Sequence, residues 1–380
     1  MRLYPRVSIR LASLLAAVAM IGALGAGCGS SRLLPRDPDE LRSLMSQRGV
    51  HQLVVPFEPD APMLRWLDET IPRHGNRLFR LEALADALLS DWGLGIDYSR
   101  DLTATAPEVF EQRIANCLSF THLYAGLARA LGIPVYFLEV RDVENYSKEG
   151  DLIVHSDHIA IGYGPEHELT IIDFAVRPGT QYRKIRAIDD LTAVALFYSN
   201  RGAEHLRHGK PDAARQWLKS AVAIDPELAA AWVNYGVALR RTGNSAAAAA
   251  SYRRALEIDA TEYSAYQNLA ALLRIEGKEA EAMELLAVAA DAGNRNPFAY
   301  LALGDLSWRH GRVDQAQRFY RRAVRLNAEQ AEPLAALGLW ELDHGNSREA
   351  QRLLRRALRL DPSEPRVVQL SSRLGTPPGA

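Results

Sequence analysis

The sequence predicts an α+β domain over residues 55–190 and an all-α repeat solenoid over residues 191–375. In the first part, segments with helical spacing of apolar residues precede segments rich in β-branched and aromatic residues, which is the order of an α+β domain. In the second part, small residues recur every 34 positions, which is typical of a repeat array. A cysteine, Cys117, stands between the predicted helices and strands, where a loop turns into an apolar helix.

Length and charge limit the classes of protein to consider. The chain has 380 residues, of which 48% are hydrophobic, so it can form two or three domains with cores of their own. Its formal net charge is −1, which offers no electrostatic attraction to nucleic acid. We therefore expect no nucleic-acid partner.

The first 28 residues have the composition of a secretory signal. Three arginines in the first ten residues precede an uncharged apolar stretch over residues 11–26, which is too short and glycine-rich for a convincing permanent membrane span. The stretch ends in Leu24-Gly-Ala-Gly-Cys28, which resembles the lipobox of bacterial lipoproteins, although Leu24 stands one place further from the cysteine than usual. The resemblance implies that Cys28 is lipidated and becomes the mature N-terminus; a plain cleaved signal or an anchor is the alternative.

A lipidated N-terminus implies a location for the mature protein. Two or three acyl chains hold a protein stably on a membrane. Gly29, rather than an aspartate, follows Cys28, and among Gram-negative lipoproteins this resembles the class directed to the outer membrane. We therefore expect a lipid-anchored protein of the bacterial cell envelope, tethered through residues 29–54 to the periplasmic face of the outer membrane.

The cysteine content favours a reactive role for Cys117. The chain holds two cysteines, Cys28 and Cys117, so lipidation of the first leaves the second without a disulfide partner in its own chain. In an oxidising compartment a structural cysteine is normally paired. The N–H groups at a helix start also favour a thiolate over a thiol. The alternative is that Cys117 is a small buried hydrophobic residue.

The other elements of the first part follow from helix caps and from spacing. Asp37 before Pro38 and Thr105 before Glu108 are helix starts, because their side chains can accept the first free N–H groups. Helices are predicted from Pro38 to near Gly49, over 61–71, over 77–92, after Thr105 and over 117–131, and strands over 133–140, within 151–163 and over 169–174. Side chains expected in the core include Met63, Leu64, Trp66, Leu67, Phe79 and Trp92.

A thiol nucleophile needs a base, and the base needs an acceptor for its other ring nitrogen. His158 opens one predicted strand and Asp173 lies on the next, so a hairpin can bring the two side chains together. His155 is a rival base, although its position in a regular strand would place it on the opposite face of the sheet. His155, Asp157 and His158 could also be metal ligands, but no separate third ligand group has a recognisable spacing, and we expect no metal.

Three segments, together with His158 on a predicted strand between the second and the third, resemble the transglutaminase-like superfamily. They are Asn-Cys-Leu-Ser-Phe-Thr at 116–121, Leu-Ala-Arg-Ala-Leu-Gly-Ile-Pro-Val at 127–135 and Ile-Asp-Phe at 172–174. The resemblance implies a papain-like fold with a Cys-His-Asp triad, in which Cys117 is the nucleophile, His158 the general base and Asp173 the orienting carboxylate. Such a triad needs no cofactor, and we expect none.

Acyl transfer also needs hydrogen-bond donors for the oxyanion of its transition state. The backbone N–H of Cys117 is one expected donor, and the side chains of Gln112 and Asn116 are candidates for a second. The sequence does not choose between these two residues. Both can equally be ordinary polar residues at helix ends.

The resemblance implies acyl transfer from an amide through a thioester. With water as the acceptor the protein is a cysteine peptidase or amidase, and with an amine it is a transglutaminase-type acyl transferase. We expect hydrolysis, because water is abundant and bacterial relatives of this type are often proteases. The alternative is a non-catalytic envelope scaffold or assembly protein with a degenerate transglutaminase-like module, although the intact Cys-His-Asp set favours an enzyme.

The second part of the chain follows one spacing. It resembles the tetratricopeptide repeat, with five units starting near 195, 229, 263, 297 and 331 and a capping helix over 365–374. The small residues on the 34-residue spacing are Gly202, Gly236, Ala270, Gly304 and Gly338, then Gly209, Gly243, Gly277, Gly311 and Gly345, and then Ala214, Ala248, Ala282, Ala316 and Ala350.

Repeats of this kind stack into a solenoid whose groove binds a peptide or a protein. A spacer or a dimerisation surface is the alternative. Arginine pairs recur at 253–254, 321–322 and 355–356, which is a weak indication of an acidic partner and is more often a solvated face. We expect a membrane-tethered cysteine hydrolase whose solenoid recruits its substrate or a regulator.

Overall fold

The computed structural model describes residues 10–11, 35–99, 102–149, 152–165, 168–174, 185–291 and 297–375. The predicted lipidation site, Cys28, lies outside these residues. The described chain forms two compact units, the first within Met1–Asn145 and His155–Thr242 and the second within Tyr146–Val154 and Gly243–Ala380. No helix among the described residues is long and apolar enough to cross a membrane.

The first unit opens with five helices, each of which begins at a side-chain cap. An oxygen of Asp37, Asp60, Asn76, Thr105 or Asn116 accepts a backbone N–H of the helix that follows it. Thr105 and Glu108 form the complete capping box that the sequence predicts. The helices are α1 (Pro38–Gln47), α2 (Ala61–Thr70), α3 (Arg77–Leu89), α4 (Ala106–Gln112) and α5 (Cys117–Ala130).

Three side chains expected in the core are instead exposed. Leu64 follows the buried Met63 by one residue, about 100° further round α2, and therefore faces solvent. Phe79 lies on the surface, where its ring stacks on that of His74. Trp92 is 69% exposed because α3 ends at Leu89, before it. Trp66 is partly buried and packs edge-on against Phe110.

The first unit contains a five-stranded sheet of order β1-β6-β5-β4-β7, in which β1 precedes the helices in the chain and the other four strands follow α5. Strands β5 and β6 are antiparallel, with Ile161 opposite Ile172, and β7 pairs with β4 as an edge strand that the sequence does not reveal. A separate pair, β2 (Asp97–Tyr98) and β3 (Ile114–Ala115), is parallel. The sheet contains β1 (Arg10–Leu11), β4 (Tyr136–Glu149), β5 (Leu152–Tyr163), β6 (Thr170–Ile172) and β7 (Ile185–Ile188).

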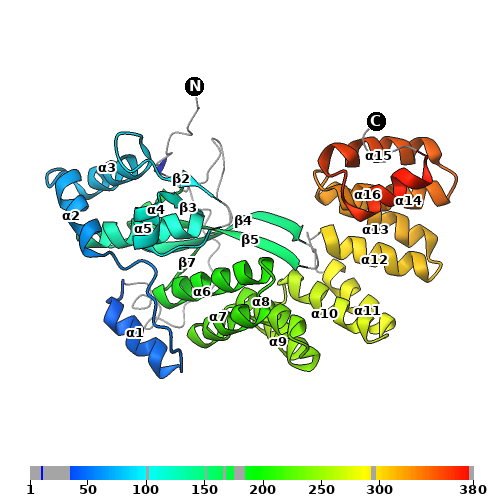
Figure 1. Cartoon of the computed structure of the whole chain (residues 1–380), viewed down its shortest axis with the longest axis horizontal. Coiled ribbons are helices and arrows are strands. Elements are labelled where there is room, and N and C mark those ends of the chain that lie inside the picture. The colour runs from blue at the N-terminus through cyan, green and yellow to red at the C-terminus, as the bar shows by residue number, and fades with distance from the viewer. Residues whose placement is uncertain are drawn as a thin grey trace, which may run out of the picture. The chain divides into compact units, whose positions relative to one another are not determined.

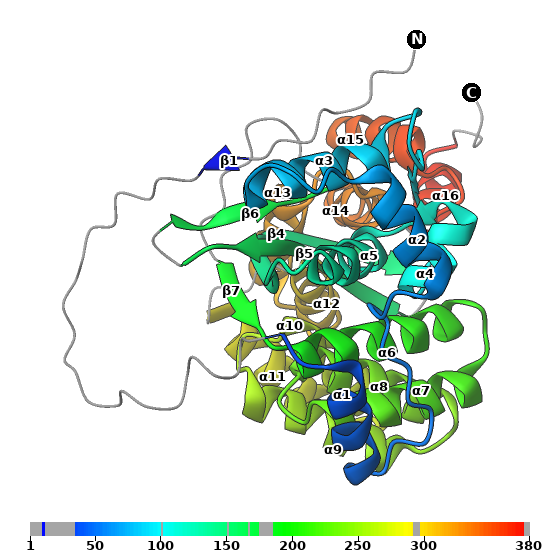
Figure 2. The same cartoon turned by 90° about the vertical axis from the view of Figure 1, so that its left-hand side faces the viewer.

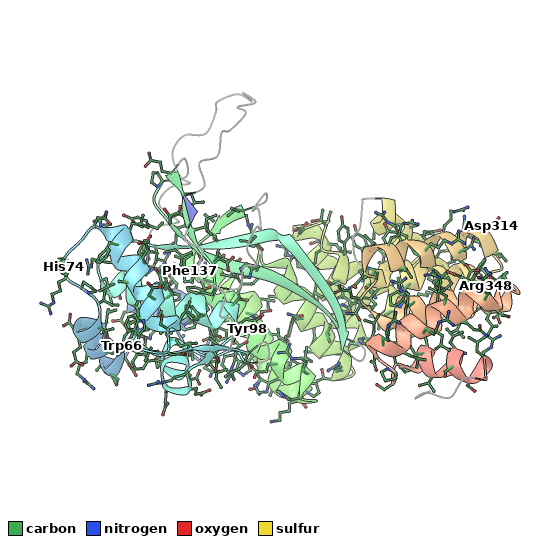
Figure 3. The ribbon with its side chains drawn as sticks, turned by 90° about the horizontal axis from the view of Figure 1, so that it is seen from above. Trp66, His74, Tyr98, Phe137, Asp314 and Arg348 are labelled. Carbon is green, nitrogen blue, oxygen red and sulfur yellow. The ribbon has the colours of Figure 1, made fainter. Side chains whose placement is uncertain are left out.

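Helix α5 lies against β4 and β5 at the centre of this unit (Figure 2). Every residue from Leu118 to Ala128 is buried. Phe137 of β4, labelled in Figure 3, is fully buried and packs against the rings of Phe57 and His122. Gly126 is required where α5 crosses the backbone of Phe57, because a Cβ there would stand 2.0 Å from the Phe57 carbonyl oxygen.

Paired helices make up most of the remaining described residues. In the first unit α6 (Asp190–Arg207) packs on α7 (Pro211–Ile224), and α8 (Ala229–Arg241) packs on both (Figure 1). In the second unit Asp314 of α13 and Arg348 of α15 lie on the surface (Figure 3). That unit contains α9 (Ser245–Ile258), α10 (Tyr263–Ile275), α11 (Glu279–Asp291), α12 (Pro297–Arg309), α13 (Val313–Leu326), α14 (Ala331–Asp343), α15 (Ser347–Leu360) and α16 (Pro365–Arg373).

The small residues of the 34-residue spacing have two structural roles. One series lies at helix contacts, where a Cβ on Gly202 would stand 2.4 Å from the side chain of Leu218 and one on Gly304 2.5 Å from the ring of Tyr320. The other series lies in the turns between paired helices, where the backbone is left-handed and favours glycine. The turn glycines are Gly209, Gly243, Gly277, Gly311 and Gly345.

The capping helix α16 is joined to two repeats by one arginine. The guanidinium of Arg366 donates to both carboxylate oxygens of Asp305 on α12, at 3.0 and 2.7 Å, and lies 3.6 Å from Glu332 on α14. The hydroxyl of Tyr320 donates to the same Asp305 at 2.8 Å. Although burial opposes it, the two carboxylates raise the pKa of Arg366 above its ordinary value.

A buried ion pair joins α5 to α6. The guanidinium of Arg129 forms two hydrogen bonds with the carboxylate of Asp190, at 2.9 and 2.8 Å, and also donates to the carbonyl of Val135. The rings of Phe57 and Phe137 both lie about 5.1 Å from the guanidinium carbon. The helix that carries Cys117 and the first repeat helix therefore share one enclosed polar contact.

We expect Asp190→Ala to lower the free energy of unfolding of the first unit by about 3–5 kcal/mol, because it leaves the charge of Arg129 buried without its partner. The matched control is Asp68→Ala, which removes the exposed pair between Asp68 and Arg73 and should change stability by less than about 1 kcal/mol. Urea unfolding followed by tryptophan fluorescence measures both. Equal effects of the two substitutions would contradict the assignment.

Candidate functional site

Cys117 is the first residue of α5 and is partly buried. The side-chain oxygen of Asn116 caps the helix by accepting the N–H of Ser119 at 2.8 Å. Upstream, Arg113 ends α4 in the left-handed region, with φ of 57°, so the chain reverses and enters β3 before Asn116. The sequence expectation that Cys117 stands at a helix start therefore matches the structure.

His158 and Asp173 meet across the hairpin of β5 and β6. The register pairs Ile161 with Ile172, and its continuation places Asp173 diagonally across from His158 on the same face of the sheet. Their side chains are largely buried, and Nε2 of His158 lies 2.5 Å from Oδ2 of Asp173. A carboxylate in this position fixes the orientation of the imidazole ring.

Two contacts hold the histidine and aspartate strands against the cysteine helix. The hydroxyl of Thr121 lies 2.7 Å from the carbonyl oxygen of Cys117 and 3.3 Å from that of Ile159, so its single proton joins α5 to β5. The ring of Phe120 packs on Phe174, next to Asp173, with centroids 3.6 Å apart. The three predicted residues are thus carried by elements that contact one another.

The pKa of His158 depends on its burial and on two neighbouring groups. Burial alone would lower this pKa, but hydrogen bonds with Asp173 and with Cys117, together with the negative charges these two groups can carry, raise it to about 10. Since Nε2 faces Asp173, the other ring nitrogen, Nδ1, is left for the cysteine. The raised pKa therefore reflects an imidazole with acceptors near both of its ring nitrogens.

The candidates for the second oxyanion donor differ in their surroundings. The side chain of Asn116 is buried, and its amide nitrogen donates to the hydroxyl of Thr103 at 3.1 Å, so the structure gives this residue a capping role. Gln112 is exposed at the last turn of α4. The oxyanion assignment of both residues stays a prediction.

His122, on the same helix as Cys117, is not an alternative base. His122 is completely buried among the rings of Phe57, Phe137 and Phe197, and this burial lowers its pKa to about 3. The side chains of His155 and Asp157 lie outside what the structure describes. Among the described side chains, no group of three or more His, Cys, Asp or Glu could hold a metal ion.

Sequence reasoning missed Thr103, which contacts the site from a loop. It is 2% exposed and accepts the hydrogen bond from Asn116, while the next residue, Ala104, donates its N–H to the hydroxyl of Ser119 at 2.9 Å. No local signal marks it, because its partners stand more than ten residues further along the chain.

Comparisons with known proteins identify the second part of the chain. The family model described as tetratricopeptide repeat matches residues 200–265 and 301–365. No curated protein sequence matches the chain. The prediction of tetratricopeptide repeats is confirmed, and this region indicates protein–protein interaction.

Solved structures give similar matches over about half of the chain. PilF of Pseudomonas aeruginosa is 21% identical, covers 49% of this chain and 84% of its own, and has a TM-score of 0.44. MamA of Desulfovibrio magneticus RS-1 is 20% identical, with 45% and 97% covered and a TM-score of 0.35. YrrB, described as a tetratricopeptide-repeat protein with an unusual peptide-binding site, is 16% identical, with 47% and 92% covered and a TM-score of 0.34.

The pKa shifts of the two histidines predict opposite pH dependences of stability. The pKa of His158 is raised from 6.5 to about 10. Its contribution to the free energy of unfolding is therefore complete below about pH 6.5 and is lost as the pH rises towards 10. The pKa of His122 is lowered to about 3, so its contribution is complete above about pH 6.5 and is lost as the pH falls. Between pH 7 and 10 we expect the free energy of unfolding of the wild type to fall by an amount on the order of a few kcal/mol. In His158→Gln this fall should be absent.

Urea unfolding of the wild type, His158→Gln and His122→Phe from pH 4 to 10 measures both effects. His122→Phe should flatten the acid side of the profile and leave the alkaline side unchanged. An alkaline slope that survives His158→Gln would contradict the proposed interaction of His158 with Asp173 and Cys117.

Proposed function

We propose that the protein is a cysteine peptidase or amidase that transfers the acyl group of an amide to water through a thioester. The observation that carries this proposal is the 2.5 Å approach of His158 Nε2 to Asp173, on strands that pack against the helix that begins at Cys117. A nucleophile, a base and an orienting acceptor are then in one place, as this chemistry requires. The proposal includes the transglutaminase-like assignment of this domain, which is supported by the motifs around Cys117, His158 and Asp173.

Each residue of the triad has a defined step in this reaction. The thiolate of Cys117 attacks the carbonyl carbon of the amide and forms a tetrahedral oxyanion. His158 then gives its proton to the leaving nitrogen, the C–N bond breaks and a thioester remains. A water molecule next gives a proton to His158 as it attacks the thioester, which releases the acid and restores the thiolate. Asp173 holds the ring in one orientation through both steps.

The electrostatics at the start of α5 support the same chemistry. The N–H groups of the first helical turn point along the axis out of the N-terminal end of the helix and carry partial positive charge. That field favours the thiolate before attack and the oxyanion after it. The backbone N–H of Cys117 belongs to this turn and is our proposed first oxyanion donor.

The remaining parts of the proposal concern location and recruitment. We propose that Cys28 is lipidated and holds the protein at the periplasmic face of the bacterial outer membrane; the support is the signal-like composition of the first 28 residues. The tetratricopeptide repeats are proposed to bind a peptide or protein that is the substrate or a regulator of the hydrolase.

The reactivity of the thiol tests the enzyme proposal. We expect iodoacetamide to modify Cys117 at a nearly constant rate from about pH 6 to 9, because a cysteine that is paired with a histidine in a triad reacts as the thiolate. In His158→Ala the rate should fall about tenfold or more at pH 6 and rise with pH as for an ordinary thiol near 8.5. Mass spectrometry of the peptide that contains Cys117 separates its modification from that of Cys28.

A slow reaction that is the same in the wild type and in His158→Ala would reject the triad. That result would favour the non-catalytic scaffold. His122→Phe is the control, because His122 lies in the core on the same helix as Cys117 and is not part of the proposed triad.

The acyl acceptor is tested by product analysis. With an unfolded protein substrate and a fluorescent primary amine, we expect new amino and carboxyl termini and little amine in the products. Cys117→Ala should form neither product. Incorporation of the amine in excess of cleavage would replace hydrolysis by transglutaminase-type transfer.

A further inference from the structure

Thr103, a buried residue near the site, accepts hydrogen bonds from two different parts of the first unit. The carbonyl oxygen of Thr103 accepts a hydrogen bond from Nη1 of Arg201 at 3.0 Å, and its hydroxyl accepts one from the side-chain amide of Asn116 at 3.1 Å. Arg201 belongs to α6, the first repeat helix, whereas Asn116 precedes Cys117. A short chain of hydrogen bonds therefore runs from the first repeat to the residue beside the cysteine.

Arg201 is itself held within the first pair of repeat helices. Its guanidinium carbon lies 5.5 Å from the centre of the Trp217 ring on α7, and its Nη1 is 3.6 Å from the carboxylate of Glu204. The ring of Trp217 also packs on Tyr198 of α6, whose hydroxyl accepts the N–H of Val54 at 2.8 Å. The donor that reaches Thr103 thus has little freedom to move independently of the first repeat.

The other end of the chain is equally enclosed. Asn116, Ser119 and the segment of Thr103 and Ala104 form three linked hydrogen bonds of 2.8, 2.9 and 3.1 Å. All four residues are buried. A displacement of Thr103 must therefore move the cap of α5 or break one of these bonds, and Cys117 is the residue immediately after that cap.

We propose that Arg201 is a positioning residue for the thiol of Cys117, so that the first tetratricopeptide repeat forms part of the support of the active site. The inference rests on the proposed function of Cys117. Arg201 acts through Thr103 and Asn116, which set the direction of the first turn of α5 and therefore the place of the sulfur relative to the ring of His158. Loss of the Arg201 hydrogen bond leaves the triad residues in place with a less well defined sulfur position.

The test is the rate of Cys117 alkylation by iodoacetamide in the full chain, measured from pH 5 to 10. In Arg201→Ala we expect the rate at pH 6 to fall about five- to tenfold and the flat pH profile to slope like that of an ordinary thiol. Arg201→Lys keeps a charged donor of similar length and should recover at least about half of the rate. The control is Arg215→Ala on α7, whose side chain is about half exposed and pairs only loosely with Asp212.

Two further variants test the positioning role and the triad separately. Thr103→Val removes the hydroxyl that Asn116 binds while keeping the shape, so it should lower the rate in the same way even if Arg201→Ala fails to fold. His158→Ala reports the triad alone. A wild-type rate that depends on His158 but is unchanged in Arg201→Ala and Thr103→Val overturns the positioning role and leaves the proposed function standing. A wild-type rate that does not depend on His158 overturns both.

Discussion

The nearly complete burial of helix α5 is the constraint on which the first unit depends. Residues from Leu118 to Ala128 are buried among other helices and the sheet, where a polar group without a partner is costly. Ser119, Thr121 and Tyr124 pair with backbone groups from the segments around the helix. These bonds fix the direction of α5, and the start of the helix places Cys117 at the edge of the core.

The two ends of α5 contact different parts of the protein. Its start lies at the candidate site, and its end contacts the first repeat helix. At its start, Asn116 caps the helix and contacts the loop of Thr103. Near its end, Arg129 pairs with Asp190 under the rings of Phe57 and Phe137. A charge in such a place is stable only with its partner, so the first repeat helix is held to the domain by electrostatics as well as by packing.

The first repeat differs from the others for the same reason. Helix α6 begins at Asp190 and has 18 residues, whereas α8, α10, α12 and α14 have 13 each. Its extra first turn carries the Asp190 contact, and the following turns carry Tyr198 and Arg201. The repeat spacing is retained in its glycines, but one face of the helix serves the neighbouring domain.

Features that depend on near neighbours or on strict spacing could be predicted from the sequence. The cap at Thr105, the start of α5 at Cys117 and the turn glycines from Gly209 onward each follow from a few consecutive residues. His158 and Asp173 were also predictable, because a hairpin joins the two strands that carry them. The exposure of Phe79 and Trp92, and the hydrogen bond from Arg201 to Thr103, 98 positions away, depend instead on the packing of the folded protein. The physical reason is that burial and long-range hydrogen bonds depend on how completed elements pack, which no local pattern of residues records.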